Sequence, residues 1–355
     1  MKAVSLFTGA GGMDVGFSKA GVSVIWANEL DEDAAATYQK NNPETTLRQG
    51  DIKKAKSELS RLIKVDMIFG GPPCQGFSVA GKMDPNDERS KLIWEYLDVV
   101  DILKPKVFIM ENVKALGELQ KWQAVRERII DTALSIGYSC FSKVLNAADF
   151  GVPQKRERVF FIGFLNAENN VEALFEKQIA LKEQPRVSLR DCLLKLPAAG
   201  TEGNPITCTA KISLASSPIL RKSPYAGMLF NGLGRPLDLD NQANTLPASM
   251  GGNKTPILDE QLLYDPAAFN WVINYHGGLS DDKNHKPVSV PEHMRRITTV
   301  EAAAIQTFPA DYEFIGEKSS IYRQIGNAVP CDLAAAVAKA VIEVFNMIYP
   351  QQISA

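Results

Sequence analysis

The sequence predicts an α/β protein with a doubly wound, mostly parallel sheet and a smaller inserted domain. Short apolar segments alternate with segments of helical spacing in the first half of the chain. This order produces a parallel sheet with helices on both faces. Hydrophobic residues make up 45% of the 355 residues, enough for a large core. After about residue 180 the alternation gives way to stretches rich in Ser, Pro, Gly and Asn, which indicates a separate, irregular region.

The spacing of apolar residues places the individual elements. Strands are expected at 2–7, 23–29, 46–51, 65–71 and 106–111, with 140–147 and 158–164 as a closing strand pair. Helices are expected at 13–20, 31–41, 92–103 and 122–137. The segment 332–349 contains Lys339 and Glu343, so we expect a packed C-terminal helix there and not a membrane span.

The inserted region has an unusual charge pattern. Residues 203–237 contain no Asp or Glu, but they include Lys211, Arg221, Lys222 and Arg235. Helical spacing returns from Arg295. We therefore expect a first domain at 1–180, an inserted domain at 181–288 and a segment at 289–355 that completes the first domain. A formal net charge of −2 means that any nucleic acid would have to meet a local basic face.

Cysteine usage and hydropathy predict an intracellular, cytoplasmic protein. The five cysteines are widely spaced and form no CxxC pair, which argues against a disulfide framework and a structural zinc site. The first apolar run is too short for a signal peptide, and no run approaches membrane-spanning length. No membrane partner is expected.

The segment Gly70-Gly71-Pro72-Pro73-Cys74-Gln75-Gly76-Phe77-Ser78 places one thiol directly after an apolar strand. Open α/β sheets bind their ligands at the carboxyl ends of strands. The two glycines and two prolines restrict the backbone around the sulfur. Taken alone, the pattern also fits an ordinary turn with a half-buried cysteine.

A second candidate site follows the first strand, where Phe7-Thr8-Gly9-Ala10-Gly11-Gly12 opens a helix. Glu29 ends the second strand, where a carboxylate accepts hydrogen bonds from ribose hydroxyls, and Asp51 ends the third, within reach of an adenine amino group. The spacing is not GxGxxG, and no lysine stands where a phosphate-binding loop needs one. The set fits an adenosine ligand without a pyrophosphate, with S-adenosylmethionine as the candidate. A plain turn with capping acids remains an alternative.

Three further segments carry polar groups near strand ends or helix starts. Glu111 closes the fifth strand, so its carboxyl could face the same crevice as Cys74, or it could cap a helix. Gln154, Arg156 and Arg158 alternate before an apolar strand, so they could share one face and bind an anion or a carbonyl. A solvated basic edge is the alternative. The run QIGNAVP, from Gln324, precedes the last helix and alone indicates only a turn.

Together these segments resemble, in order and over nearly the whole chain, the cytosine-C5 DNA methyltransferase family of bacterial and phage restriction-modification systems. The matching blocks are FTGAGG with Asp14 and Gly16, Asn28-Glu29, Gly50-Asp51-Ile52, GPPCQGFS, Asp87-Glu88-Arg89, Glu111-Asn112-Val113, Gln154-Lys155-Arg156-Glu157-Arg158, Arg295-Arg296-Ile297-Thr298 with Glu301, Gln306-Thr307-Phe308-Pro309 and QIGNAVP. The resemblance implies a Rossmann-like, S-adenosylmethionine-dependent fold. In that fold, the inserted domain would recognise the DNA target.

The resemblance also implies roles for individual residues. Cys74 would attack C6 of a flipped-out cytosine, and Glu111 would protonate or hydrogen-bond N3 and the exocyclic amine. Arg158 would bind O2, and Arg156 would brace Glu111 or a phosphate. The residues expected to bind S-adenosylmethionine, which leaves as S-adenosylhomocysteine, are Phe7, Gly9, Gly11, Gly12, Glu29, Leu30, Asp51, Ile52, Pro73, Leu92, Asn327 and Val329. Those expected to contact DNA are Gln75, Ser78, Arg89, Gln154 and Thr245.

The partners that the resemblance implies are double-stranded DNA and a cognate restriction endonuclease, with a monomeric enzyme and no metal. A tRNA cytosine methyltransferase of the same fold is an alternative, although Gln75 to Ser78 resembles the DNA branch. A catalytically silent DNA-binding member would be expected to lack Cys74 or Glu111, and both are present. A nicotinamide-dependent oxidoreductase would leave the Cys74 segment unexplained.

Overall fold

The computed structural model describes residues 1–59, 64–73, 91–168, 170–282, 285 and 289–350. Contacts divide the chain into two compact units. Unit 1 comprises Met1–Gly151, Arg156–Pro185 and the chain from Val329 onward, and unit 2 comprises Val152–Lys155 and Arg186–Ala328. The sequence expectation also had one region inserted into another, but it grouped 289–328 with the first domain, whereas their contacts lie in unit 2. The functions expected of the domains stay a prediction.

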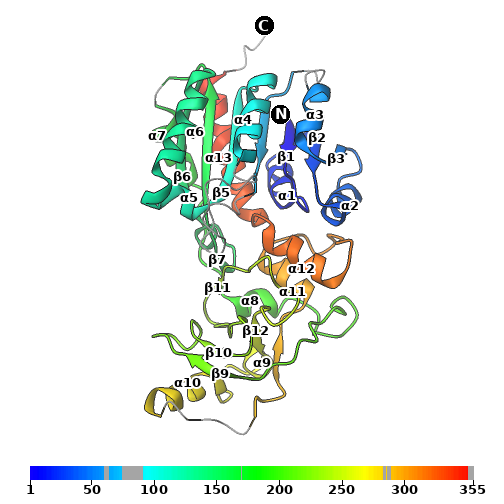
Figure 1. The fold of residues 1–355 in the computed structure, drawn as a ribbon, viewed down its shortest axis with the longest axis vertical. Helices are drawn as coiled ribbons and strands as arrows, with labels where there is room; N and C mark the ends of the chain where they lie inside the picture. Colours follow the sequence, from blue (N-terminus) through cyan, green and yellow to red (C-terminus); the bar gives the residue numbers. More distant parts are fainter. Residues whose placement is uncertain (60–63, 74–90, 169, 283–284, 286–288, 351–355) are drawn as a thin grey trace. The chain divides into compact units, whose positions relative to one another are not determined.

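Seven strands of unit 1 form one sheet in the order β3-β2-β1-β4-β5-β8-β6 (Figure 1). The strands are β1 (Lys2–Leu6), β2 (Ser23–Glu29), β3 (Thr46–Gln49), β4 (Met67–Gly70), β5 (Val107–Val113), β6 (Tyr138–Asn146) and β8 (Glu157–Leu165). The first five are parallel, and β8 runs antiparallel to both β5 and β6. The mostly parallel sheet and its closing strand pair are therefore confirmed. Strand order reverses between β1 and β4, where doubly wound sheets open their binding crevice.

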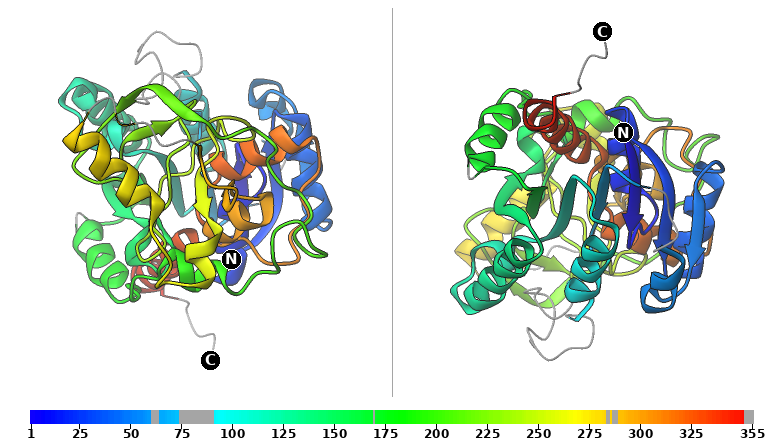
Figure 2. Two further views of the ribbon diagram at one scale, coloured as in Figure 1. Left: turned by 90° about the horizontal axis from the view of Figure 1, so that it is seen from below. Right: turned by 90° about the horizontal axis from the view of Figure 1, so that it is seen from above.

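Helices cover both faces of this sheet. On one face α1 (Gly12–Lys19) and α7 (Val171–Ala180) pack against α13 (Cys331–Ile348). On the other face lie α3, α4, α5 and α6, and the right-hand view of Figure 2 shows α13 and α7 on the opposite side of the sheet from α4 and α6. The remaining helices of the unit are α2 (Glu32–Asn41), α3 (Ile52–Leu59), α4 (Leu92–Leu103), α5 (Lys114–Glu118), the 3₁₀ turn η2 (Gln120–Trp122), α6 (Gln123–Ser135) and the 3₁₀ turn η3 (Ala147–Asp149).

The core of unit 1 explains why these segments fold as they do. All residues of β4 are buried, as are the first six residues of β5, because helices cover the sheet on both sides. Phe108 of β5 lies at the centre of one face, with ring centroids 6.3 Å from Tyr96 and 5.2 Å from Tyr138. The sheet and its two helix layers thus hold the strand ends, where the site residues lie, on a rigid frame.

Unit 2 is built from short elements and loops, as the composition predicted for 203–237. Its paired strands are β7 (Gln154–Lys155) with β11 (Ala243–Asn244), β9 (Leu214–Ile219) with β10 (Met228–Phe230), and β12 (Ile257–Asp259) with β13 (Met294–Arg296). Its helices are α8 (Leu189–Leu193), α9 (Glu260–Tyr264), α10 (Trp271–Asp281), α11 (Thr299–Ile305) and α12 (Lys318–Asn327). The left-hand view of Figure 2 shows how little regular structure joins these pieces.

Two small apolar clusters hold unit 2 together. One contains Leu246, Leu258 and Tyr322, and the other contains Phe230 and Tyr275. Among the described residues, no helix is long and apolar enough to cross a membrane. In the same part of the chain, no three His, Cys, Asp or Glu side chains gather in a way that could hold a metal ion.

Candidate active site

A glycine-rich turn connects β1 to α1 at the carboxyl edge of the sheet. Phe7 and Gly9 both have φ of 55°, and Gly11, the residue before the helix, has φ of 84°. These values lie in the left-handed region, which glycine occupies at little cost. The Gly11 N–H donates to the Thr8 carbonyl at 3.0 Å, which closes the turn. The backbone therefore forms a compact cradle in front of the α1 N-terminus.

Glu29, at the end of the neighbouring strand β2, holds this turn in place. Its carboxylate accepts hydrogen bonds from the N–H groups of Gly9 at 2.7 Å, and of Leu30 and Asp31, each at 2.8 Å. Burial raises the pKa of the Glu29 carboxyl, and these hydrogen bonds oppose the shift. A carboxylate offers about four lone-pair positions, so three donors leave room for a ribose hydroxyl. The sequence predicted the ribose role but not the brace on Gly9.

The other residues predicted to bind the cofactor belong to unit 1, apart from Asn327. Leu30 is 68% exposed, which is unusual for a large apolar side chain. Asp51 is exposed and Ile52 is buried. Asn28 joins the ends of β2 and β3 by donating to the carbonyls of Arg48 and Gly50. The carboxylates of Glu29 and Asp51 provide hydrogen-bond acceptors near the ends of β2 and β3, which fits the hydroxyl and amino groups of an adenosine ligand. Phe7, Pro73 and Leu92 are half-buried, and Val329 is buried in unit 1.

A second cluster lies at the end of β5. The Glu111 carboxylate forms an ion pair with Arg158, with 2.8 Å between Oε1 and Nε. The two residues come together because β5 and β8 are antiparallel neighbours, with Val113 opposite Arg158. Both side chains are mostly buried, at 12% and 14% exposed. The sequence expectation gave the bracing of Glu111 to Arg156, whereas this ion pair joins Glu111 to Arg158.

The loop that precedes Cys74 packs directly on this pair. A Cβ added to Gly71 would lie 2.8 Å from Oε2 of Glu111, so only glycine lets the carboxylate approach the loop so closely. Asn112 also holds the loop, because its amide donates to the Pro72 carbonyl at 3.2 Å. Glu111 and Asn112 thus fix the described part of the loop, which ends at Pro73. The remaining residues predicted for this loop, Cys74, Gln75, Ser78 and Arg89, lie outside the described residues.

Burial and charge act on Glu111 in opposite directions. Burial raises the pKa of its carboxyl, while the positive charges of Arg158 and Arg156 lower it. Burial is the larger effect, so the carboxyl keeps a proton to higher pH than an exposed glutamate does. Arg156 is only 2% exposed. The site therefore combines a carboxyl that can donate a proton with two guanidinium groups.

The predicted DNA contacts Gln154 and Thr245 belong to unit 2, as does the exposed cofactor candidate Asn327. Gln154 is fully buried; its side-chain carbonyl accepts from the Leu246 N–H at 3.0 Å and its amide donates to Gln306 at 3.1 Å. Thr245 is exposed and donates to the Lys155 carbonyl at 2.9 Å. Gln154 is therefore in a different unit from Arg156 and Arg158. Sequence spacing indicated a shared face, but it could not show that the chain changes unit between residues 155 and 156.

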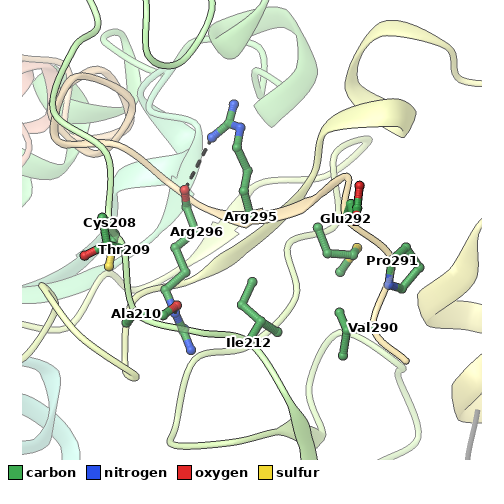
Figure 3. A pocket seen from close by; sticks show the side chains of 10 residues that line it. Cys208, Thr209, Ala210, Ile212, Val290, Pro291, Glu292, Arg295 and Arg296 are labelled. Carbon is green, nitrogen blue, oxygen red and sulfur yellow. Dashed lines mark hydrogen bonds between the residues drawn. The ribbon is translucent and has the colours of Figure 1, made fainter. Parts of the chain in front are cut away.

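Unit 2 also contains a pocket of about 280 Å³ that includes none of the predicted site residues. Figure 3 shows its lining, which includes Cys208, Ile212, Glu292, Arg295 and Arg296. Arg295 forms ion pairs with Glu260 and Glu301, each with a nitrogen–oxygen distance of 2.7 Å. Arg295 is thus held by ion pairs within unit 2.

One buried residue near the glycine turn had no role in the sequence expectations. Asp14, on α1, is 1% exposed, and its carboxylate accepts hydrogen bonds from Ser5 and Tyr38. In the sequence it stands two residues after Gly12 and belongs to a recognised block, but it was given no role. Gln306 was likewise part of a recognised block without an assigned role.

Sequence comparisons relate this chain to known proteins. Residues 1–343 match the family model for C-5 cytosine-specific DNA methylase. Type II methyltransferase M.FnuDI of Fusobacterium nucleatum is 36% identical over 97% of this chain and 94% of its own length. M.NgoPII of Neisseria gonorrhoeae is 32% identical over 96% and 95%.

Solved structures share the fold. A DNA modification methyltransferase encoded within an E. coli prophage has a TM-score of 0.66 at 23% identity, covering 98% of this chain and 99% of that chain. The Dnmt2 methyltransferase of S. pombe has a TM-score of 0.64 at 18% identity, covering 98% and 99%. The family model and the two relatives span almost the entire sequence. This chain therefore belongs to the C-5 cytosine-specific DNA methylase family.

Proposed function

We infer that the protein is a DNA (cytosine-5-)-methyltransferase, and we propose that it acts on a cytosine flipped out of a short, specific duplex sequence. Family membership supports methylation of cytosine C5 in DNA. The observation that carries the proposed mechanism is the Glu111–Arg158 pair, packed against Gly71 three residues before Cys74. The base must leave the helix because C5 and C6 cannot be attacked within the stack.

Cys74 is the proposed nucleophile. Its thiolate adds to C6 of the cytosine, and the electrons of the C5–C6 double bond then make C5 nucleophilic toward a methyl group. After transfer, a base acting through water takes the C5 proton, the electrons of the C5–H bond re-form the C5–C6 double bond, and the C6–sulfur bond breaks to release the Cys74 thiolate. A free thiol has a pKa of about 8.5 and needs electropositive surroundings to ionise. We propose that Arg156 and Arg158 help to supply them.

Glu111 is the proposed acid on the base. Its raised pKa keeps a proton available for N3, and a hydrogen bond to the exocyclic amine would orient the ring. Protonation at N3 withdraws electrons from the ring and favours attack on C6. Arg158, which already holds Glu111, would bind O2, and Arg156 would brace the carboxylate or a phosphate.

The methyl donor is proposed to bind at the carboxyl ends of β1, β2 and β3. When bound, S-adenosylmethionine supplies an electrophilic methyl group, and S-adenosylhomocysteine is the product. Glu29 would hold the ribose, the turn from Gly9 to Gly12 would approach the methionine part, and Asp51 would face the adenine. Phe7, Leu30, Ile52, Pro73, Leu92, Asn327 and Val329 complete the proposed set.

Unit 2 is the proposed DNA-reading part. Its acid-free stretch, residues 203–237, suits phosphate contacts, and exposed Thr245 is available to bind the backbone. Gln75, Ser78 and Arg89 are proposed to contact DNA from the loop that follows Cys74. We also propose that the protein is a monomer of the bacterial or phage cytoplasm, paired with a restriction endonuclease of the same specificity, because relatives are named Type II methyltransferases.

Transfer of a labelled methyl group to duplex DNA, with tRNA as the competing substrate, tests this function. Wild-type protein should label DNA only, Cys74→Ala should label neither, and Glu111→Gln should lose on the order of a hundredfold in rate. Exposed Glu118→Gln is the matched control and should retain full activity. Labelling of tRNA alone would establish the RNA alternative. DNA binding by wild-type protein without any transfer would identify a catalytically silent member.

A further inference from the structure

Asp14 is a buried carboxylate that the proposed mechanism does not use. It lies in the first turn of α1, two residues after Gly12, and is 1% exposed. Its Oδ2 accepts from Ser5 Oγ at 3.0 Å, and its Oδ1 accepts from the Tyr38 hydroxyl at 2.9 Å. Among the described residues it forms no ion pair with a Lys or Arg. Both of its protein partners are neutral hydroxyl groups.

These hydrogen bonds join the segments that form the candidate cofactor site. Ser5 precedes the glycine turn and Asp14 follows it, so their bond closes the base of the loop that contains the turn. Tyr38 belongs to α2, which begins directly after the Glu29 segment. The Asp14 carboxylate is therefore fixed behind the cradle.

In the part of the chain that the structure describes, no cationic side chain pairs with Asp14, which lies in the first turn of α1 and accepts hydrogen bonds from neutral groups. Burial raises the pKa of its carboxyl to about 7, and the hydrogen bonds from Ser5 and Tyr38 oppose the shift. From α13 the group facing it is the Cys331 thiol, whose pKa is raised by burial. On β2 the titratable group is Glu29, which is half-buried and also a carboxyl. A buried anion with no cationic partner is stabilised by any cation that binds nearby.

The methyl donor and its product differ in charge, and a buried carboxylate interacts differently with a charged and a neutral ligand. S-adenosylmethionine carries a permanent positive charge on sulfur, whereas S-adenosylhomocysteine has a neutral thioether and otherwise nearly the same shape. A fixed negative charge in a low-dielectric site attracts the first more than the second. Hydrogen bonds that only shape the cradle would affect both compounds alike.

We propose that Asp14 is a positioning and charge-selective residue of the cofactor site, which favours the cationic methyl donor over the neutral product. This inference rests on the proposed function, because it assumes that S-adenosylmethionine occupies the cradle. Its consequence for turnover is that transfer of the methyl group removes the attraction, which assists product release.

Calorimetric titration of the full-length protein with each compound, without DNA at pH 8, tests this inference. Asp14→Asn removes the charge and keeps the shape, so it should reduce the preference for S-adenosylmethionine over S-adenosylhomocysteine by roughly three- to tenfold. Glu32→Gln on α2 is the matched control, because it removes the charge of an exposed carboxylate and leaves Asp14 and its hydrogen bonds in place. It should leave the preference within about twofold of wild type.

The pH dependence gives a second, independent readout. The preference of the wild-type protein for the methyl donor should increase from pH 6 to pH 8, as Asp14 loses its proton, relative to Asp14→Asn measured in parallel. Protonation of the ligands themselves affects the measurements on both proteins equally, so it cancels when wild type is compared with Asp14→Asn. Tyr38→Phe removes a hydrogen bond that lowers the Asp14 pKa, so it should shift this increase to higher pH. This variant keeps the test decisive if Asp14→Asn does not fold.

Two results would overturn the inference in distinguishable ways. Equal losses for both compounds in Asp14→Asn, with no pH-dependent difference from wild type, would show that Asp14 only shapes the cradle. The proposed function would survive that result. Wild-type protein that binds neither compound would contradict the proposed cofactor site and this inference together.

Discussion

The two units satisfy their buried backbone groups by different means. In unit 1 a seven-stranded sheet pairs the backbone of neighbouring strands, from β3 at one edge to β6 at the other. In unit 2 the sheets have only two strands each, and loops fill much of the interior. Buried N–H and C=O groups need partners wherever they lie, so the loops of unit 2 must find them among side chains.

Unit 2 finds these partners in a few long polar side chains. Arg296 is 2% exposed and donates to the carbonyls of Ala210 at 3.0 Å, Asn253 at 3.2 Å and Thr255 at 2.6 Å. The fully buried Gln306 donates to the Ile325 carbonyl at 2.7 Å and accepts from Gln154. One side chain thus connects several loops that no strand ladder joins.

Unit 1 uses its buried polar side chains differently. Because the sheet already pairs the strands, Glu29 and Glu111 can be placed at strand ends, where they hold the glycine turn and the Gly71 loop. In unit 1 the strands pair with one another, so polar side chains are available to build a site. In unit 2 the loops lack such pairing, so polar side chains hold the loops together. Apolar truncation should therefore damage unit 1 most, and polar truncation should damage unit 2.

The largest effect is expected from Phe108→Ala in unit 1. The ring is fully buried on β5 between two tyrosines, so truncation leaves a cavity and should lower the free energy of unfolding by about 4 kcal/mol. Leu134→Ala on α6, where the side chain is 63% exposed, is the control and should change it by less than about 0.5 kcal/mol. Denaturant unfolding gives both values, and equal losses would refute the packing argument.

Arg296→Met should be the most damaging polar change in unit 2. Removing the guanidinium leaves three loop carbonyls without their donor, and we expect a loss of about 3 kcal/mol. Hydrogen exchange should rise in peptides of unit 2 while unit 1 keeps its protection. The exposed Arg235→Met is the matched control. Equal protection in Arg296→Met and Arg235→Met would break the comparison between the units.

The buried glutamine pair should show a smaller, coupled effect. Gln154→Leu and Gln306→Leu should each cost about 1–2 kcal/mol because each leaves buried hydrogen-bonding groups unpaired. The double variant should lose less than the sum of the single losses, by about 1 kcal/mol, since the two amides bind each other. Exposed Gln261→Leu serves as control. Strict additivity in denaturant unfolding would mean that the pair is not a unit.

The smallest effect is expected at the surface of unit 1. Lys19 and Asp332 form an ion pair at 2.8 Å, with both side chains more than 40% exposed. Lys19→Met should therefore change the free energy of unfolding by about 0.5 kcal/mol or less, and less still in high salt. A loss comparable to that of Arg296→Met would contradict the claim that framework roles require burial.

Sequence reasoning succeeded for elements that are marked by the spacing of their apolar residues and by their position in the chain. The strand expected at 23–29 and the helix expected at 92–103 agree with β2 and α4. Helices α3 and α7 were missed by the sequence prediction. In α3 charged residues between Lys53 and Lys56 interrupt the apolar spacing of a helix, and charged residues also precede Val171, where α7 begins.

Long-range polar contacts were the part that the sequence could not supply. Nothing in the spacing links Gln154 to Gln306, which are 152 residues apart, or Arg296 to Ala210. The brace of Glu29 on Gly9 depends on the neighbouring positions of β1 and β2, which follow only from the folded sheet. Such contacts form between surfaces brought together by folding, so local patterns do not encode them.

The most direct test of the central claim is bisulfite sequencing of DNA from cells that express the wild-type protein or Cys74→Ala. The account predicts protected cytosines only with the wild-type protein, all within one short sequence. Protection that persists with Cys74→Ala would contradict the proposed nucleophile. No protection with a folded wild-type protein that binds S-adenosylmethionine would contradict its assignment to DNA.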